Sequence, residues 1–231
     1  MIICYSGKSA PSANLIADED DDITAVRHGR GDVNYGRASA RTSLNPDISN
    51  STNKRVMREL FREHNVPMPQ LYNQADAITA VLSGLTIVGR PDQHTKGRGF
   101  WKINTLNQFD RALGGTRHKK AATHFMEYVE APHEYRVHVF RGKSIRISEK
   151  KFFIDEDGHN NYTTMKPTGN IKHVRKAAKK AVKALGLDFG AVDVLATDEQ
   201  AWVLEVNAAP GLGGTMPALY ANVFKKWNSN G

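Results

Sequence analysis

The 231-residue sequence has little of what covalent cross-linking or membrane insertion would require. Its single cysteine, Cys4, cannot form an internal disulfide, and one thiol cannot build a cysteine zinc site, so we interpret it as a small core residue. The chain lacks a run of about 18 apolar residues. It also lacks a basic segment followed by a long apolar one near residue 1, the pattern of a secretory signal. These absences predict a cytoplasmic protein with no membrane span.

Basic residues outnumber acidic ones, because 32 lysines and arginines against 24 aspartates and glutamates give a net charge of +8. This balance favours an anionic partner, such as a nucleotide, an acidic peptide or nucleic acid, without choosing among them. The acidic run at residues 18–22 is interpreted as a solvated loop. The lysine-rich stretch from Lys172 to Lys183 is more typical of a solvated helix face than of a nucleic-acid contact.

The hydrophobic pattern predicts an α+β fold, with largely antiparallel sheets that helices cover. Hydrophobic residues make up 40% of the chain, enough for one large domain or a domain with a small appendage. A strand is expected at residues 1–5, in an N-terminal segment too small to hold a core alone. Residues 36–53, rich in Ser, Asn and Arg, are interpreted as a linker or an ordered loop.

Regular elements follow that segment. Ser51 or Thr52 is expected to cap a helix that ends before residues 65–69, and Thr215 to cap a helix after the glycines of PGLGGTMP. Other helices are predicted at about 75–82, 105–113 and 171–185. Strands are predicted at 85–88 and 124–130, and two hairpins at 134–140 with 144–150 and at 190–197 with 201–207.

The last hairpin carries three polar side chains within apolar strands. Glu205 and Asn207, in VLEVN, point to the same face because strand side chains alternate with a period of two. Pairing with AVDVL could bring Asp193 beside them. Two carboxylates and an amide oxygen suit Mg²⁺, which binds hard oxygen ligands and phosphates. Alone, the VLEVN stretch is equally typical of an edge strand whose polar face meets solvent.

Two further stretches could bind parts of a nucleotide. In IVGRPDQHTKGRGF, Arg90 precedes a loop whose glycines would let backbone amides approach phosphate oxygens, although such a loop alone is more often a plain turn. In HFMEYVEAPHEYRVHVF, Glu127 ends an apolar strand, and its neighbouring backbone could bond adenine while a nearby acid bonds ribose. Glu130 is interpreted as a solvated acid, and His138 as a candidate substrate contact.

These stretches together resemble the ATP-grasp ligases. Lys54 at the start of a helix ending in VPMP, then IVGRPDQHTKGRGF, MEYVEAPHEYRV, GAVDVL and VLEVNAAPGL, occur in the order and spacing of that family over about residues 50–215. The chain is similar to the amino acid ligases that extend protein tails, to D-alanine ligases, and to short phage-encoded members. The resemblance implies two α+β subdomains clasping ATP, at about 51–125 and 126–231, after a reduced N-terminal segment at 1–50.

The resemblance also implies roles for individual residues. Lys54 and Arg90 would touch the ATP phosphates, and the loop with Lys96, Gly97 and Gly99 would lie over them. Adenine would be bound by Glu127 with the backbone of Tyr128 and Val129, and ribose by Glu134. Two Mg²⁺ ions, with Mn²⁺ as an alternative, would be held by Asp193, Glu205 and Asn207. The reacting phosphoryl group would lie near Arg136 and near Lys150 or Lys151.

The function implied by the resemblance is ATP-dependent ligation of a carboxylate, an amino acid or acidic peptide, to an amine. The reaction would pass through an acyl phosphate and release ADP and phosphate. Arg90 stands where the family usually has lysine, which keeps the charge but alters the geometry. The alternative is a basic binding module for nucleic acid or an acidic protein on a catalytically altered scaffold. The intact Asp193, Glu205 and Asn207 favour chemistry over that alternative, and the sequence assigns neither substrates nor oligomeric state.

Overall fold

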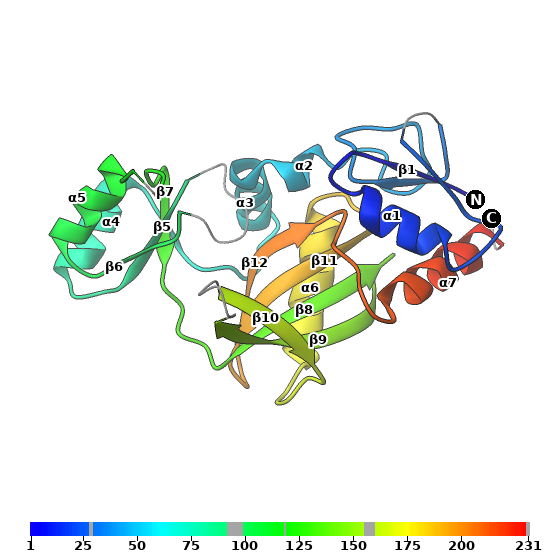
Figure 1. Cartoon of the computed structure of the whole chain (residues 1–231). Helices are drawn as coiled ribbons and strands as arrows, with labels where there is room; N and C mark the ends of the chain where they lie inside the picture. Colours follow the sequence, from blue (N-terminus) through cyan, green and yellow to red (C-terminus); the bar gives the residue numbers. More distant parts are fainter. Residues whose placement is uncertain (28–29, 92–98, 118, 155–159, 230–231) are drawn as a thin grey trace. The chain divides into compact units, whose positions relative to one another are not determined.

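The chain folds into two compact units in a computed structural model that describes residues 1–27, 30–91, 99–117, 119–154 and 160–229 (Figure 1). One unit comprises Met1–Pro67 with Pro132–Gly231, and the other Met68–Ala131. Both mix helices with sheets, which confirms the expected α+β class. The subdomain boundaries expected near residues 50 and 125 stay predictions.

The larger unit is built on a five-stranded antiparallel sheet in the order β10-β9-β8-β11-β12. Both hairpins expected from the alternating pattern are confirmed, and the first turns at Arg141 and Gly142, whose positive φ values of 43° and 74° suit a tight hairpin. The strands are β8 (His133–Phe140), β9 (Lys143–Ile154), β10 (Asn160–Met165), β11 (Phe189–Ala196) and β12 (Ala201–Asn207).

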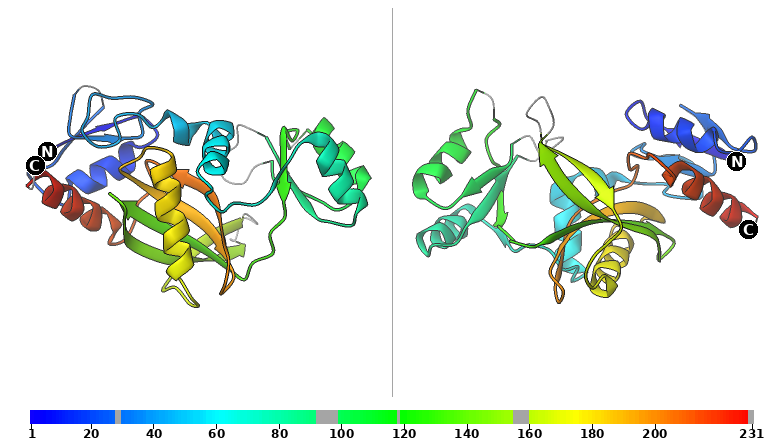
Figure 2. Two further views of the ribbon diagram at one scale, coloured as in Figure 1. Left: turned by 180° about the vertical axis from the view of Figure 1, so that it is seen from behind. Right: turned by 60° about the horizontal axis from the view of Figure 1, so that its bottom comes forward.

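Helix α6 (Lys172–Ala184) packs against this sheet, as the view from behind in Figure 2 shows. Its apolar stripe, including Val174, Ala178 and Val182, is buried, whereas its lysines are exposed. The helix expected at 171–185 is therefore confirmed. Because α6 covers one face of the sheet, the polar side chains of β8, β9, β11 and β12 gather on the other.

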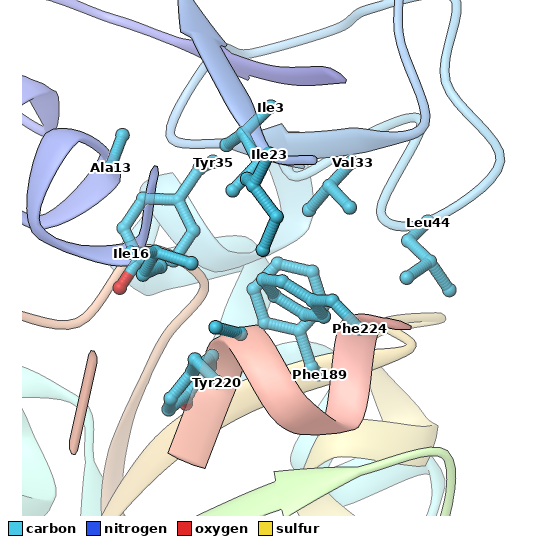
Figure 3. Close-up of a cluster of buried hydrophobic side chains, with 11 residues drawn as sticks. Ile3, Ala13, Ile16, Ile23, Val33, Tyr35, Leu44, Phe189, Tyr220 and Phe224 are labelled. Atoms are coloured by element: carbon cyan, nitrogen blue, oxygen red, sulfur yellow. The ribbon is translucent and has the colours of Figure 1, made fainter. Parts of the chain in front are cut away.

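The N-terminal part adds a small parallel sheet, β2-β1-β3, formed by β1 (Ile2–Tyr5), β2 (Thr24–Val26) and β3 (Val33–Tyr35). With α1 (Ala10–Ala17) it packs onto α7 (Met216–Asn228). Figure 3 shows the shared core, in which Tyr220 and Phe224 from α7 meet Ile3, Tyr35 and Phe189. The N-terminal segment is too short to form a hydrophobic core alone, and it shares one with α7.

The acidic run at residues 18–22, expected to be a solvated loop, is tied to this core by an ion-pair network. Lys225 Nζ on α7 lies 2.6 Å from Asp20 Oδ2 and 3.2 Å from Asp22 Oδ2. These contacts lie at the surface, where water screens such pairs, so they add little to the free energy of folding. Four of the five acids are exposed, so the expected solvated loop is confirmed, and Lys225 anchors it at Asp20 and Asp22.

Residues 36–53 form an ordered loop rather than a free linker. Asn45 is buried at a φ of 50°, and its Oδ1 accepts hydrogen bonds from the backbone N–H groups of Asp188 (2.7 Å) and Phe189 (3.2 Å). Its Nδ2 donates to the Phe189 carbonyl at 3.0 Å. The Asn45 side chain therefore binds backbone N–H and C=O groups at the start of β11, as a neighbouring strand would, and holds the loop against the large sheet.

The segment 36–53 ends with a short helix, α2 (Ser49–Thr52), and α3 (Lys54–Glu63) follows it. The side chain of Asn53 caps α3 by accepting from the backbone N–H groups of Arg55 and Val56. The expectation that Ser51 or Thr52 caps this helix was wrong, because both residues belong to α2.

The smaller unit, Met68–Ala131, has an antiparallel sheet in the order β4-β7-β5-β6. Ile87, Ile103, Phe109 and Phe125 fill its core. The predicted helices near 75–82 and 105–113 are confirmed, capped by the side chains of Asn73 and Thr105. The elements are β4 (Leu71–Tyr72), α4 (Gln74–Leu82), β5 (Ile87–Arg90), β6 (Trp101–Ile103), α5 (Leu106–Gly114) and β7 (His124–Glu127). In the part of the chain that the structure describes, no helix has the length and apolar character needed to cross a bilayer.

Candidate active site

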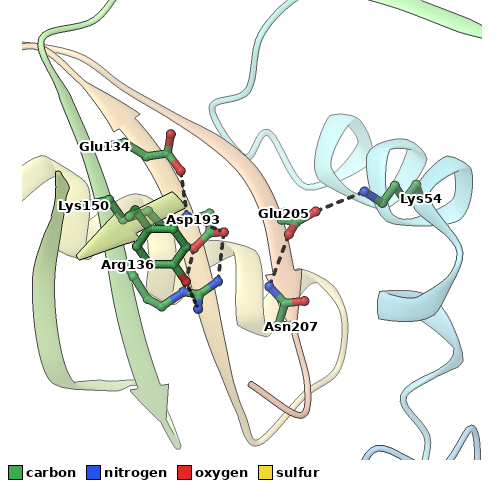
Figure 4. Close-up of polar contacts among 8 residues, drawn as sticks. Lys54, Glu134, Arg136, Lys150, Asp193, Glu205 and Asn207 are labelled. Atoms are coloured by element: carbon green, nitrogen blue, oxygen red, sulfur yellow. Dashed lines mark hydrogen bonds and ion pairs between the residues drawn. The ribbon is translucent and has the colours of Figure 1, made fainter. Parts of the chain in front are cut away.

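The three expected metal ligands lie together on β11 and β12 (Figure 4). Asp193 is the direct cross-strand partner of Glu205, and the register shifts immediately after Asp193. Directly opposed residues of an antiparallel pair share a face of the sheet. Asn207 is on that face as well, and its Nδ2 donates to Glu205 Oε1 at 3.3 Å. The hairpin therefore brings two carboxylates and an amide to one place, as the sequence predicted.

Asp193 is buried, with 6% of its surface exposed, and it is compensated by two cations. Arg136, its partner on β8, donates from Nε to Oδ1 at 2.9 Å and from Nη2 to Oδ2 at 3.1 Å. Lys150 Nζ lies 2.8 Å from Oδ2. Such a bidentate pair offsets the cost of removing the carboxylate from water. Burial alone would lower the pKa of Arg136, but the Asp193 carboxylate outweighs it and raises that pKa.

Lys150 connects Asp193 to Glu134, whose Oε1 lies 2.7 Å from Lys150 Nζ. Burial opposes the charge of Lys150, yet the Asp193 and Glu134 carboxylates keep its pKa above the usual value. Burial raises the pKa of Glu134, and the opposing charge of Lys150 only partly cancels the effect. Lys151, the alternative to Lys150, is exposed on the opposite face of β9. The structure brings Lys150 into the cluster and leaves Lys151 outside it.

Lys54 contributes a third cation from the first turn of α3. Its Nζ donates to Glu205 Oε2 at 3.1 Å, so the helix start and the end of β12 are joined by an ion pair. Figure 4 shows Lys54 reaching Glu205 while Arg136 and Lys150 surround Asp193. Each carboxylate of the candidate metal site is thus paired with a cation of the same unit.

Tyr162, which the sequence analysis did not single out, also contacts this cluster. Arg136 Nη1 donates to its hydroxyl at 3.0 Å, and Lys150 Nζ lies 5.0 Å from its ring centroid. Tyr162 belongs to β10, a strand that the sequence did not predict because its residues are mostly polar and lack an apolar period of two. The one available signal was a single aromatic residue in that polar stretch.

Of two further residues expected near the site, His138 has a structural contact, whereas the Thr215 side chain does not cap α7. His138 is 4% exposed, and its Nδ1 shares a 2.9 Å hydrogen bond with the hydroxyl of Tyr220. Burial, together with the charge of Arg136, lowers the pKa of His138 to about 4, so this imidazole is neutral near pH 7. Thr215 precedes α7 as expected, but its side chain makes no capping hydrogen bond.

The smaller unit carries the residues expected to bind adenine and phosphates. Arg90 ends β5, with its guanidinium carbon 5.1 Å from the ring centroid of Phe100. Glu127 ends β7, and the Tyr128 N–H, just beyond it, donates to the Thr86 carbonyl at 3.2 Å. Gly99 has a φ of +86°, and a Cβ there would lie 2.7 Å from Pro91. Lys96 and Gly97 lie outside the described residues.

Comparison with known sequences gives two remote relatives, and no family model matches the chain. The chain is 25% identical over 181 residues to a probable alpha-L-glutamate ligase of Parasynechococcus marenigrum (strain WH8102), covering 72% of this chain and 38% of that protein. It is 24% identical over 214 residues to a probable alpha-L-glutamate ligase of Cellvibrio japonicus (strain Ueda107), covering 85% and 71%. The chain thus spans well under half of the first relative.

Comparison with solved structures finds similar folds along nearly the whole chain. A D-alanine--D-alanine ligase from Bacillus anthracis superimposes with a TM-score of 0.67 at 14% identity, covering 96% of this chain and 91% of the other. The ATP-grasp ligase PsnB, complexed with a minimal precursor, Mg and ADP, gives 0.68 at 13%, covering 97% and 96%. The D-cycloserine synthetase DcsG gives 0.65 at 16%, covering 98% and 99%.

Proposed function

Because this chain has the ATP-grasp fold, we propose that it is an ATP-dependent carboxylate–amine ligase that forms an amide bond and releases ADP and phosphate. The observation that carries the proposal is the cluster of acids and cations at one face of the large sheet, to which α3 adds Lys54. Asp193 and Glu205 supply negative charge there, and Lys54, Arg136 and Lys150 supply positive charge. A site of this composition can bind both the oxygens of a triphosphate and the divalent cations that accompany it.

The donor set fits a divalent cation. Asp193, Glu205 and Asn207 offer hard oxygen atoms on two paired strands, the ligand type that Mg²⁺ prefers. The described residues contain no group of three His, Cys, Asp or Glu side chains placed to hold a metal ion, so amide, water or phosphate oxygens would complete the coordination. Bound Mg²⁺, or Mn²⁺ in its place, would supply neutralisation of phosphate charge. We propose two ions, which Asp193, Glu205 and Asn207 would hold.

In this proposal the chain mainly positions its substrates and neutralises charge. A carboxylate oxygen attacks the γ-phosphorus of ATP, the bond to ADP breaks, and an acyl phosphate forms. The amine nitrogen then attacks the acyl carbon, phosphate leaves, and the nitrogen gives its proton to solvent. Arg136 and Lys150, held by Asp193, would face the oxygens on which charge develops, while Lys54 would bind the phosphate chain.

The smaller unit carries further residues for which we propose nucleotide contacts. Arg90 and the loop with Lys96, Gly97 and Gly99 would bind phosphates. Adenine would pack near Glu127 and bond the backbone of Tyr128 and Val129. Because the Tyr128 N–H already donates to Thr86, its carbonyl is the group that we expect to face adenine. Glu134, in the larger unit, would accept from ribose hydroxyls.

The substrates follow from charge and from the relatives. We propose that one substrate, either the carboxylate or its acceptor, is an acidic amino acid or an acidic peptide. The net charge of +8 and the description of both sequence relatives as glutamate ligases support this choice. The alternative, a binding module that has lost catalysis, is not favoured, because such a module would have no need to retain the acids at 193 and 205.

The decisive experiment is an ADP-release screen over pairs of amino acids, polyamines and short acidic peptides, with mass spectrometry of the products. ADP release that requires both an acid and an amine, with an amide product heavier than either, would support the proposal. Glu205→Gln is the control, since it keeps the shape of the side chain and removes one charge. Equal turnover by wild type and Glu205→Gln for every pair would refute the proposed metal role. Salt-dependent DNA retention without any nucleotide effect would favour the binding module instead.

A further inference from the structure

Tyr162 occupies an unusual position for a partly buried aromatic residue. It lies on β10, the outermost strand of the large sheet, where its neighbours Asn161 and Thr163 are exposed. An edge strand of this kind adds little to a hydrophobic core, and Tyr162 is absent from the buried core. Among the described residues, its side chain contacts the half-exposed ring of Phe152, 5.9 Å away, and the cations of Arg136 and Lys150.

The Tyr162 hydroxyl contacts the part of the Arg136 guanidinium that Asp193 does not contact. Arg136 uses Nε and Nη2 for the Asp193 carboxylate, and Nη1 donates to the hydroxyl of Tyr162 at 3.0 Å. A guanidinium held along one edge only can still tilt about that edge. A second partner on Nη1 removes this freedom, so the planar group has one orientation instead of several.

The contact with Lys150 acts through the ring. Lys150 Nζ lies 5.0 Å from the ring centroid, within the range of a cation–π interaction. Glu134 and Asp193 hold the same ammonium at 2.7 and 2.8 Å. The side chain of Lys150 is only 5% exposed, so the ring lies where water would otherwise approach the ammonium. Tyr162 thus contacts both cations that surround Asp193.

We propose that Tyr162 is a positioning residue for phosphoryl transfer: its hydroxyl orients Arg136, and its ring holds Lys150 against Glu134 and Asp193. The inference rests on the proposed ligase function for its catalytic consequence. Its structural part, the restraint of Arg136, holds for the protein without nucleotide. The two parts can therefore be tested separately.

Two variants separate the hydroxyl from the ring. Tyr162→Phe removes one charge-assisted hydrogen bond and should lower kcat about tenfold, with KM for ATP within about twofold, because only the orientation of Arg136 changes. Tyr162→Leu also removes the cation–π contact and should lower kcat about a hundredfold. Phe153→Leu is the matched control, since this half-exposed ring lies on the opposite face of the same hairpin and should leave kcat within about twofold.

The restraint itself is measured without substrate, by NMR of the Arg136 Nε–H resonance, assigned through its loss in Arg136→Lys. We expect its hydrogen exchange with solvent to accelerate at least about tenfold in Tyr162→Leu and less in Tyr162→Phe. Unchanged exchange in both variants would overturn the proposal, as would equal losses of kcat in Tyr162→Leu and Phe153→Leu. If the wild type released no ADP with any substrate pair, the ligase function would fail, while the exchange measurement would still decide the role of Tyr162.

Discussion

Removing the charge of Asp193 should destabilise the fold as well as any activity. In Asp193→Asn, Arg136 and Lys150 lose the negative charge that they share, while Arg136 keeps the hydroxyl and ring of Tyr162 and Lys150 keeps Glu134 and the same ring. Both cations are largely buried, with 16% and 5% of their side chains exposed. Removing one partner of a buried ion pair lowers the free energy of unfolding by about 3–5 kcal/mol. Because Arg136 and Lys150 keep other contacts, we expect a loss of about 3 kcal/mol. The inactivity of this variant would therefore not by itself demonstrate metal binding.

Urea unfolding followed by circular dichroism measures this effect. With a slope of about 2 kcal/mol per molar urea, a loss of about 3 kcal/mol moves the midpoint down by about 1.5 M. Glu199→Gln, at an exposed turn, should stay within about 0.5 kcal/mol of wild type. Adding Arg136→Met to Asp193→Asn should restore part of the loss, because the stranded cation is gone. A midpoint for Asp193→Asn that matches wild type would show that the ion cluster does not support the sheet.

Three other outcomes are expected. Asn45→Ala should lower the free energy of unfolding by about 3 kcal/mol in thermal melts, because three hydrogen bonds to the start of β11 are lost; a change under about 1 kcal/mol would contradict the role of this side chain. The pKa of His138 is about 4 in the folded protein and 6.5 in the unfolded chain, so the unfolded chain takes up the proton first as the pH falls. The free energy of unfolding should therefore decrease by roughly 3 kcal/mol between pH 6.5 and pH 4. His138→Gln should remove this decrease, and a pH profile of stability that this variant leaves unaltered would contradict the assignment. Lys54→Met should weaken binding of ATP with Mg²⁺ about tenfold by calorimetry, whereas exposed Arg55→Met should change it less than twofold; equal effects would refute a specific phosphate contact.

The sequence predicted elements whose hydrophobic period is long and regular. Local patterns were enough to predict these elements, namely the apolar stripe of α6 and the alternation in β8, β9, β11 and β12. The two hairpins, and with them the proximity of Asp193 to Glu205, were predicted from that alternation. The order of short motifs then led to the ATP-grasp fold. Roles of individual residues with nucleotide stay predictions.

Other features depend on contacts between residues far apart in the chain. The partners of Asn45 lie 143 and 144 positions away, and those of Arg136 lie 57 and 26 away, so no local pattern reveals them. The cap of α3 was misassigned because Ser51 and Thr52 are good caps that form a short helix of their own instead. Tyr162 was missed because polar β10 has no strand pattern of its own and is recognised only by its pairing with β9.

The joint core of the first strand and the last helix has a consequence for synthesis on the ribosome. Met68–Ala131 is a continuous stretch, so it can acquire its native packing as soon as it leaves the exit tunnel. Ile3 and Tyr35 emerge much earlier, but they must wait for Phe224 before their apolar surfaces are covered. During that interval the N-terminal part of the nascent chain exposes hydrophobic side chains. We expect chaperones to bind the chain at this stage of its synthesis.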